Sequence, residues 1–169
     1  TQLNNLKNKN FIFLDLSKNG IKIIDQIILN NKKYTSNLKI GTCDFYNQNI
    51  KHKIPINSLI YTFYALHYKK KLNDKIIKNI LKKKPMLVIH FEPIFEHFNN
   101  NTIKNIKIRN YFKKNNYSEN LLSILKRYEK GRKIKIIKEI KNCLPQNNLL
   151  PLSIIVWTPK LNLGFSKLF

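Results

Sequence analysis

Short apolar runs of strand length recur along the first part of the chain, separated by polar or amphipathic segments. The apolar runs cover residues 11–16, 38–45, 58–66 and 86–93. Isoleucines recur on one face of residues 18–30, which predicts a helix that Ser17 can cap. A second amphipathic segment, opened by Asn73 or Asp74, predicts another helix between the third and fourth runs.

The rest of the chain adds one clear helix and two closing strands. Residues 99–117 are polar and rich in Asn, so we expect a loop or a weak helix there. Ser118 can cap a leucine-bearing helix, and residues 133–140 and 152–159 predict two strands with no helix between them. The first of these alternates Lys with Ile, which is typical of a strand near a sheet edge. The chain therefore predicts a three-layer α/β fold, with a mostly parallel sheet and an antiparallel C-terminal strand pair.

Length and composition are those of one folded domain. A chain of 169 residues with 43% hydrophobic residues has enough apolar surface for a core, so we expect a single domain, 1–169. Cys43 and Cys143 lack CxxC spacing, which indicates neither a zinc site nor a disulfide framework and makes the cytoplasm the default location. No apolar run reaches the roughly 18 residues needed to span a bilayer, so no membrane partner is expected.

The net charge of +23 suggests an anionic partner such as nucleic acid. However, Lys, Asn and Ile crowd the whole sequence, as AT-rich codons produce without selection, and Arg occurs only at Arg109, Arg127 and Arg132. Codon drift is the preferred explanation, so nucleic acid is a partner that the composition allows but does not favour. The alternative function is a basic RNA-binding or ribosome-associated protein without chemistry, which one continuous basic face would support.

Acidic residues fall where three predicted strands end: Asp15, Asp44 and Glu92. In open parallel sheets, ligands bind outside the carboxyl ends of the strands, and the two oxygens of a carboxylate match a ribose diol. A strand end is also where the chain meets water, so any one of these acids needs no ligand to explain it. Three acids on one rim nevertheless favour a binding site.

The segments, in this order, resemble class I S-adenosylmethionine-dependent methyltransferases. FIFLDLSKNGIKII is similar to the second strand and following helix of that family, and IGTCDF to its third strand. SLIYTFYALHY and PMLVIHFEP are similar to its fourth and fifth strands, and the last two runs to its closing antiparallel pair. The resemblance covers about residues 9–160. It implies a Rossmann-like fold, S-adenosylmethionine as cofactor and methyl transfer, with a small-molecule acceptor as the default.

The resemblance also implies roles for single residues. The acid of the FIFLDLS segment would hold the cofactor ribose, and the acid and hydrophobic residue of IGTCDF would bracket the adenine. The implied cofactor-binding residues are Asp15, Ser17, Asp44, Phe45, Thr62 and Phe63. No Asn-Pro-Pro-Tyr type signature is present, which disfavours methylation of an exocyclic base nitrogen in DNA or RNA.

Two histidines are candidates for a general base, because imidazole titrates near neutrality. The catalytic candidates are His67, His90 and Glu92, although His90 could equally be a core residue and His67 a surface one. His90, Glu92, Glu96 and His97 also suggest a metal site. The last two follow Pro93, however, so a shared ligand geometry is not indicated and no metal is expected.

One departure from the family pattern is serious. The family carries a glycine-rich loop after its first strand, whereas this chain has only 4 Gly and no cluster of them. Residues 1–10 are too short and polar to supply that strand and loop, and the first residue is Thr1 rather than Met. We therefore expect an N-terminally truncated fragment that lacks a central strand, and whose activity in isolation is doubtful.

Overall fold

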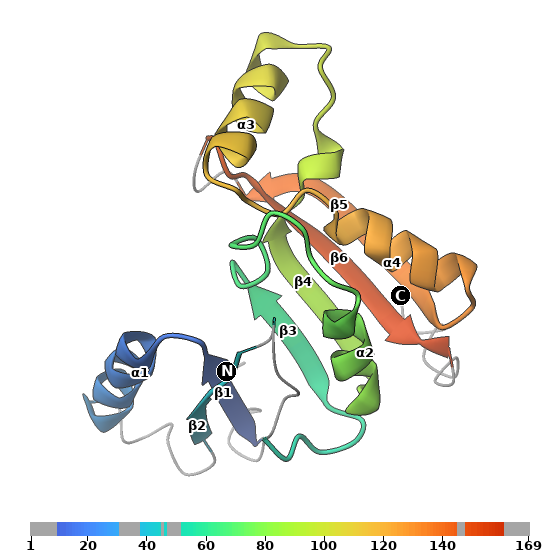
Figure 1. The fold of residues 1–169 in the computed structure, drawn as a ribbon. Coiled ribbons are helices and arrows are strands. Elements are labelled where there is room, and N and C mark those ends of the chain that lie inside the picture. Colours follow the sequence, from blue (N-terminus) through green and yellow to red (C-terminus); the bar gives the residue numbers. More distant parts are fainter. Residues whose placement is uncertain (1–9, 31–37, 45, 47–51, 145–147, 161–169) are drawn as a thin grey trace, which may run out of the picture. The chain divides into compact units, whose positions relative to one another are not determined.

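The computed structural model describes residues 10–30, 38–44, 46, 52–144 and 148–160 (Figure 1). The chain divides into two units, residues 1–54 and 55–169, and each is described by itself. The expected single domain therefore stays a prediction. In the described part of the chain, no helix is long and apolar enough to cross a bilayer.

The first unit is a strand, helix and strand in which both strands run the same way. It consists of β1 (Phe11–Asp15), α1 (Lys18–Asn30) and β2 (Leu38–Thr42). β1 pairs with β2 in parallel, with Phe11 opposite Leu38 and Asp15 opposite Thr42. Ser17 caps the helix as predicted, since its Oγ accepts a hydrogen bond from the backbone N–H of Gly20 at 3.2 Å. The predicted bounds of the helix are confirmed.

The second unit carries a mixed four-stranded sheet. Its elements are β3 (Leu59–Phe63), α2 (Lys75–Lys82), β4 (Leu87–Pro93), the 3₁₀ turn η3 (Phe95–His97), α3 (Ile103–Lys114), α4 (Leu121–Lys130), β5 (Ile134–Leu144) and β6 (Leu152–Pro159). The strand order is β3-β4-β6-β5. β3 and β4 are parallel, whereas β6 is antiparallel to both of its neighbours. The α/β class, the parallel neighbours and the antiparallel C-terminal pair are confirmed, and β5 is an edge strand as its Lys and Ile alternation predicts.

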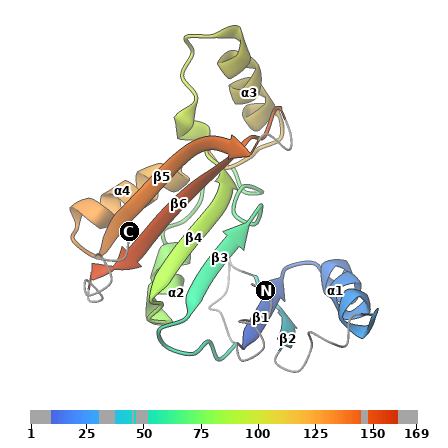
Figure 2. The same ribbon diagram turned by 180° about the vertical axis from the view of Figure 1, so that it is seen from behind.

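Helices α2 and α4 lie on the same face of this sheet, as the two views of the ribbon show (Figures 1 and 2). Under them lies the core of the unit, which includes Ile76 and Ile80 of α2, Leu125 of α4 and the fully buried Trp157 of β6. The opposite face of the sheet carries no helix from the described part of this unit. On that face the side chains of Leu59, Tyr61 and Phe63 are 52%, 60% and 52% exposed.

The Asn-rich segment, for which the sequence predicted either a loop or a weak helix, contains the helix α3. Thr102 caps it, because its Oγ1 accepts a hydrogen bond from the backbone N–H of Asn105 at 3.1 Å. Only Ile108 and Phe112 of this helix are buried, so its apolar face is narrow and its sequence pattern weak. The next helix, α4, begins after Asn120 instead of Ser118.

Candidate functional site

Two of the predicted acids lie at the same edge of the first unit's sheet. Asp15 is the last residue of β1, and Asp44 lies just past the end of β2. Because β1 and β2 are parallel neighbours, their carboxyl ends meet at one edge. Both side chains are half-buried, so each can be reached by a ligand while its position is held by the fold.

The carboxylate of Asp15 faces the first turn of α1. Its Oδ1 accepts a hydrogen bond from the backbone N–H of Ser17 at 2.6 Å, and its backbone carbonyl accepts one from Cys43 at 2.8 Å. A Cβ atom placed on Gly20 would lie 3.0–3.2 Å from the carboxylate atoms of Asp15. Gly20 thus leaves room for this carboxylate, and nothing in the sequence pattern alone marks it for that role.

Asp44 is held in a local turn, since its Oδ1 accepts a hydrogen bond from the backbone N–H of Tyr46 at 2.9 Å. Such a turn is a common structural use of Asp. The other residue expected to contact adenine, Phe45, lies outside the described residues.

Glu92 is fully buried near the end of β4 in the second unit. Its Oε1 accepts hydrogen bonds from the backbone N–H groups of Ala65 and Leu66, at 2.9 and 3.1 Å. Its Oε2 lies 3.7 Å from Nδ1 of His67, too far for a good hydrogen bond, and neither atom has a hydrogen-bond partner in the described part of the chain. A buried carboxylate oxygen and a buried imidazole nitrogen therefore face each other without a hydrogen bond, which is unusual for buried polar atoms.

Aromatic rings surround His67, which is buried and not the surface residue that the sequence allowed. Its ring centroid lies 5.5 Å from that of Tyr64, 3.9 Å from that of Tyr68 and 4.9 Å from that of Tyr117. Burial, with the charge of Glu92 as a second cause, raises the pKa of Tyr64. Its phenol therefore stays neutral beside the carboxylate. We call His67, Glu92 and these three tyrosines the His67 cluster.

His90 lies in the core with both ring nitrogens in use. Trp157 Nε1 donates a hydrogen bond to its Nε2 at 2.9 Å, and its Nδ1 lies 3.0 Å from Oγ1 of Thr62. An indole N–H can only donate, so Nε2 accepts and Nδ1 carries the proton. Burial lowers the pKa of His90 to about 4. This geometry leaves no nitrogen to take a proton from a substrate and agrees with the core histidine that the sequence left open.

Thr62 and Phe63 face opposite sides of the sheet, because side chains alternate along a strand. Thr62 is buried against His90, whereas Phe63 lies on the open face, 5.2 Å from the ring of Tyr64 and 6.3 Å from that of Phe91. Of this pair of expected contact residues, only Phe63 is accessible to a ligand.

The four residues that suggested a metal site have separate partners. Glu96 accepts a hydrogen bond from the backbone N–H of Ser123 at 2.8 Å, and His97 lies 2.8 Å from Ser153 Oγ and 3.0 Å from Glu139 Oε1. Across the residues that the structure describes, no three His, Cys, Asp or Glu side chains are grouped to hold a metal ion. In the described part of the chain, neither Cys43 nor Cys143 forms a disulfide.

Comparison with known proteins finds likeness in structure only. No family model and no curated protein matches the sequence. An O-methyltransferase family 2 protein from Planctomyces limnophilus, solved with apigenin, matches with a TM-score of 0.58 and 12% identity over 88% of this chain and 43% of that chain. The methyltransferase domain of the bacterial CtHen1 matches with a TM-score of 0.51 and 12% identity, over 94% of this chain and 93% of that one. The YcgJ protein from Bacillus subtilis matches with a TM-score of 0.50 and 11% identity, over 88% and 80%.

Identities this low show the fold alone. The chain has the fold of class I methyltransferases, as its order of segments predicts. It spans less than half the length of the first of these proteins.

Proposed function

We propose that this chain is part of an S-adenosylmethionine-dependent methyltransferase that acts on a small-molecule acceptor. The observation that carries the proposal is the pair of acids, Asp15 and Asp44, at the carboxyl ends of two neighbouring parallel strands. This is where open α/β sheets bind nucleotide-like ligands. The methyltransferases among the structural neighbours supply the reaction class.

In the first unit, we assign the cofactor ribose to Asp15. Ser17 occupies one oxygen of this carboxylate, and in the described part of the chain the other accepts no hydrogen bond, so it can accept from a ribose hydroxyl. Gly20 keeps the space beside it open. Asp44 is assigned to the adenine edge, which offers fewer donors than a diol.

In the second unit, we assign proton removal to His67. The bound cofactor supplies an electrophilic methyl group, so the chain itself needs mainly to position the acceptor and to receive its proton. Glu92 would orient the imidazole through Nδ1 and leave Nε2 to take the proton of an acceptor hydroxyl. Tyr68, whose ring lies 3.9 Å from that of His67 and is exposed, would have to turn aside to admit the acceptor.

A further strand with a glycine-rich loop belongs to this proposal. Among the described residues β3 pairs only with β4, and the described glycines, Gly20, Gly41 and Gly131, lie far apart in the sequence. We assign the glycine-rich loop and its strand to residues of the complete protein other than those that the structure describes. A complete sequence without such an apolar strand and a Gly cluster would contradict this assignment.

Titration of the complete protein with S-adenosylhomocysteine tests the function directly. We expect saturable heat of binding, and transfer of a labelled methyl group to hydroxylated small molecules when S-adenosylmethionine is supplied. A folded complete protein that binds neither cofactor form would overturn the proposal.

A further inference from the structure

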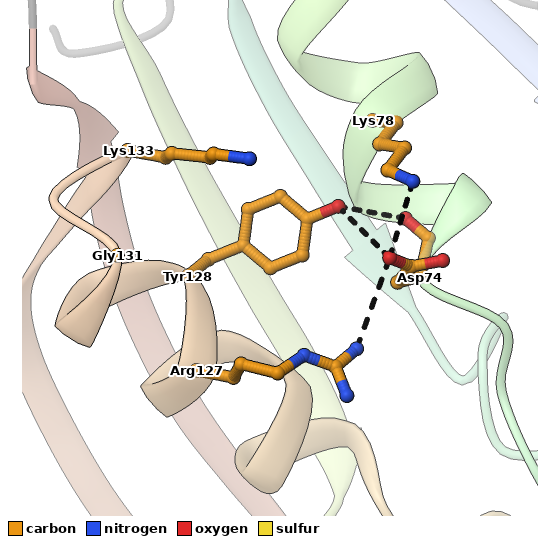
Figure 3. Close-up of a pocket in the computed structure, with 6 residues that line it drawn as sticks. All are labelled: Asp74, Lys78, Arg127, Tyr128, Gly131 and Lys133. Carbon is orange, nitrogen blue, oxygen red and sulfur yellow. Dashed lines mark hydrogen bonds and ion pairs between the residues drawn. The ribbon is translucent and has the colours of Figure 1, made fainter.

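A pocket of about 290 Å³ opens between the start of α2 and the end of α4 in the second unit (Figure 3). It is lined by Asp74, Lys78, Arg127, Tyr128, Gly131 and Lys133. It shares no residue with the His67 cluster. Nothing in the proposed methyl transfer uses it.

Three cations and a single carboxylate line this pocket, and two of the cations pair with the carboxylate. Oδ2 of Asp74 lies 3.3 Å from Nζ of Lys78 and 3.9 Å from Nη2 of Arg127. The ammonium of Lys133 lies 5.6 Å from the ring centroid of Tyr128. One carboxylate cannot balance three cations, and exposed ion pairs of this kind contribute little energy, so the cations can turn to a stronger anion.

The pocket also holds a hydrogen-bond donor. The hydroxyl of Tyr128 donates to the backbone carbonyl and to Oδ2 of Asp74, at 3.3 and 3.4 Å. Burial is the largest cause that raises the pKa of Tyr128, so the hydroxyl keeps its proton near neutral pH. A guanidinium and two ammonium groups line the same pocket and can donate to a phosphate group (Figure 3).

The surface around the pocket continues the positive charge. Exposed lysines also lie on both helices that line it: Lys75 and Lys82 on α2, and Lys130 on α4. The acid of α4, Glu129, is turned to the backbone, where its Oε1 accepts a hydrogen bond from Ile136 at 2.7 Å. The opposite face of the same sheet presents exposed apolar side chains at Leu59, Tyr61 and Phe63.

We propose that this α2 and α4 surface binds the phosphate backbone of a nucleic acid, with one phosphate seated in the pocket. The flanking lysines favour a polymer over a lone anion, because they lie outside the pocket and can contact only neighbouring phosphates. The inference is independent of the proposed methyl transfer. It also gives the +23 charge a use that codon drift does not.

The test measures binding of the full chain to a fluorescent 20-nucleotide single-stranded RNA of mixed sequence, by anisotropy, over a series of salt concentrations. The pocket variant replaces Lys78, Arg127 and Lys133 with Gln. The control variant replaces Lys104, Lys107 and Lys113 of α3, which are all exposed, with Gln. It therefore removes the same number of positive charges from a surface outside the pocket. Melting temperatures of both variants should match the parent, because all six side chains are exposed.

We expect the pocket variant to lose roughly ten- to a hundredfold in affinity at low salt, and its slope of log K against log salt to shrink by about 0.7, the value for one phosphate of a single strand. The control should lose far less. Equal losses in both variants would overturn the proposal, because they would mean that net charge alone binds RNA. Unchanged binding in the pocket variant, or no binding by the parent, would overturn it as well.

Two further experiments test whether the site binds a polymer or a free anion, and whether the phosphate lies in the pocket. Inorganic phosphate should displace the RNA only at far higher concentration, since it makes one of several contacts; displacement at low concentration would indicate a free-anion site instead. Asp74→Asn should tighten RNA binding, because it removes the competing carboxylate and its side chain makes no capping hydrogen bond to α2. Weaker binding in this variant would contradict the pocket as the seat of a phosphate.

Discussion

The role of Asp15 can be tested by removing its carboxylate from the complete protein. Asp15→Ala deletes an oxygen that we assign to the ribose and an oxygen that holds the backbone N–H of Ser17 at 2.6 Å. A hydrogen bond to a charged group contributes about 1.5–3 kcal/mol, so affinity for S-adenosylhomocysteine should fall roughly ten- to a hundredfold. The N–H of Ser17 becomes hydrated, because it lies at an exposed turn, so stability should fall by only about 1 kcal/mol.

Three further variants show whether the charge of Asp15, the space beside it or the net charge of the unit determines cofactor affinity. Asp15→Asn keeps an oxygen for Ser17 and removes the charge, so it should weaken binding without affecting stability. Gly20→Ala keeps the charge but places a Cβ about 3 Å from the carboxylate, which must then shift, so it should weaken binding by a smaller factor. Asp25→Ala, at an exposed position of α1, removes the same charge from the same unit and should leave affinity unchanged.

Calorimetric titration of each variant, with its melting temperature measured alongside, decides the matter. Asp44→Ala should act as Asp15→Ala does, but more weakly. Unchanged affinity in both Ala variants would refute the cofactor assignment. A fall in melting temperature without a specific loss of binding would show that these acids serve the fold alone.

Two other predictions concern the histidines. His67→Gln should lower the rate of methyl transfer by roughly a hundredfold or more, whereas Glu92→Gln, which still accepts from the Ala65 amide, should cost less; a rate of methyl transfer unchanged in both variants would reject His67 as the base. For His90, burial lowers the pKa to about 4 from 6.5, so the unfolded state binds the proton more tightly. The free energy of unfolding should therefore fall by about 3 kcal/mol as the pH drops from 6.5 to 4, and urea denaturation showing no fall would contradict the buried neutral ring.

Local pattern was enough to place most strands and helices of this chain. The continuous apolar run that ends at Asp15 and the isoleucine spacing after it predict β1 and α1, because each depends on residues near in sequence. Helix α3 was uncertain because its apolar face consists of only two buried residues. The position of β6 between β4 and β5 depends on contacts between distant segments, which periodicity does not report.

The candidate site divides in the same way. The places of Asp15 and Asp44 at or just after the ends of strands could be predicted, because a strand end is a local feature. The sequence could not show which histidine has a structural role, because both environments depend on distant residues. His90 is hydrogen-bonded by Trp157, 67 residues away, and His67 packs against Tyr117 from another part of the chain. The space beside Asp15 depends on Gly20, whose effect is visible only once the helix turn is folded back on the carboxylate.

The two edges of the second unit's sheet differ in a way that supports a missing strand. The edge strand β5 carries Lys135, Lys138 and Lys141, and lysines on an edge discourage further pairing. The other edge strand, β3, reads LIYTF, with no charge and no Pro, and its Tyr61 is 60% exposed. A strand of this kind, left bare, would pair with other chains and aggregate. Among the described residues one edge is protected and the other is not, so we expect a further strand to pair with β3; in the methyltransferase that we propose, this would be a parallel strand followed by the glycine-rich loop.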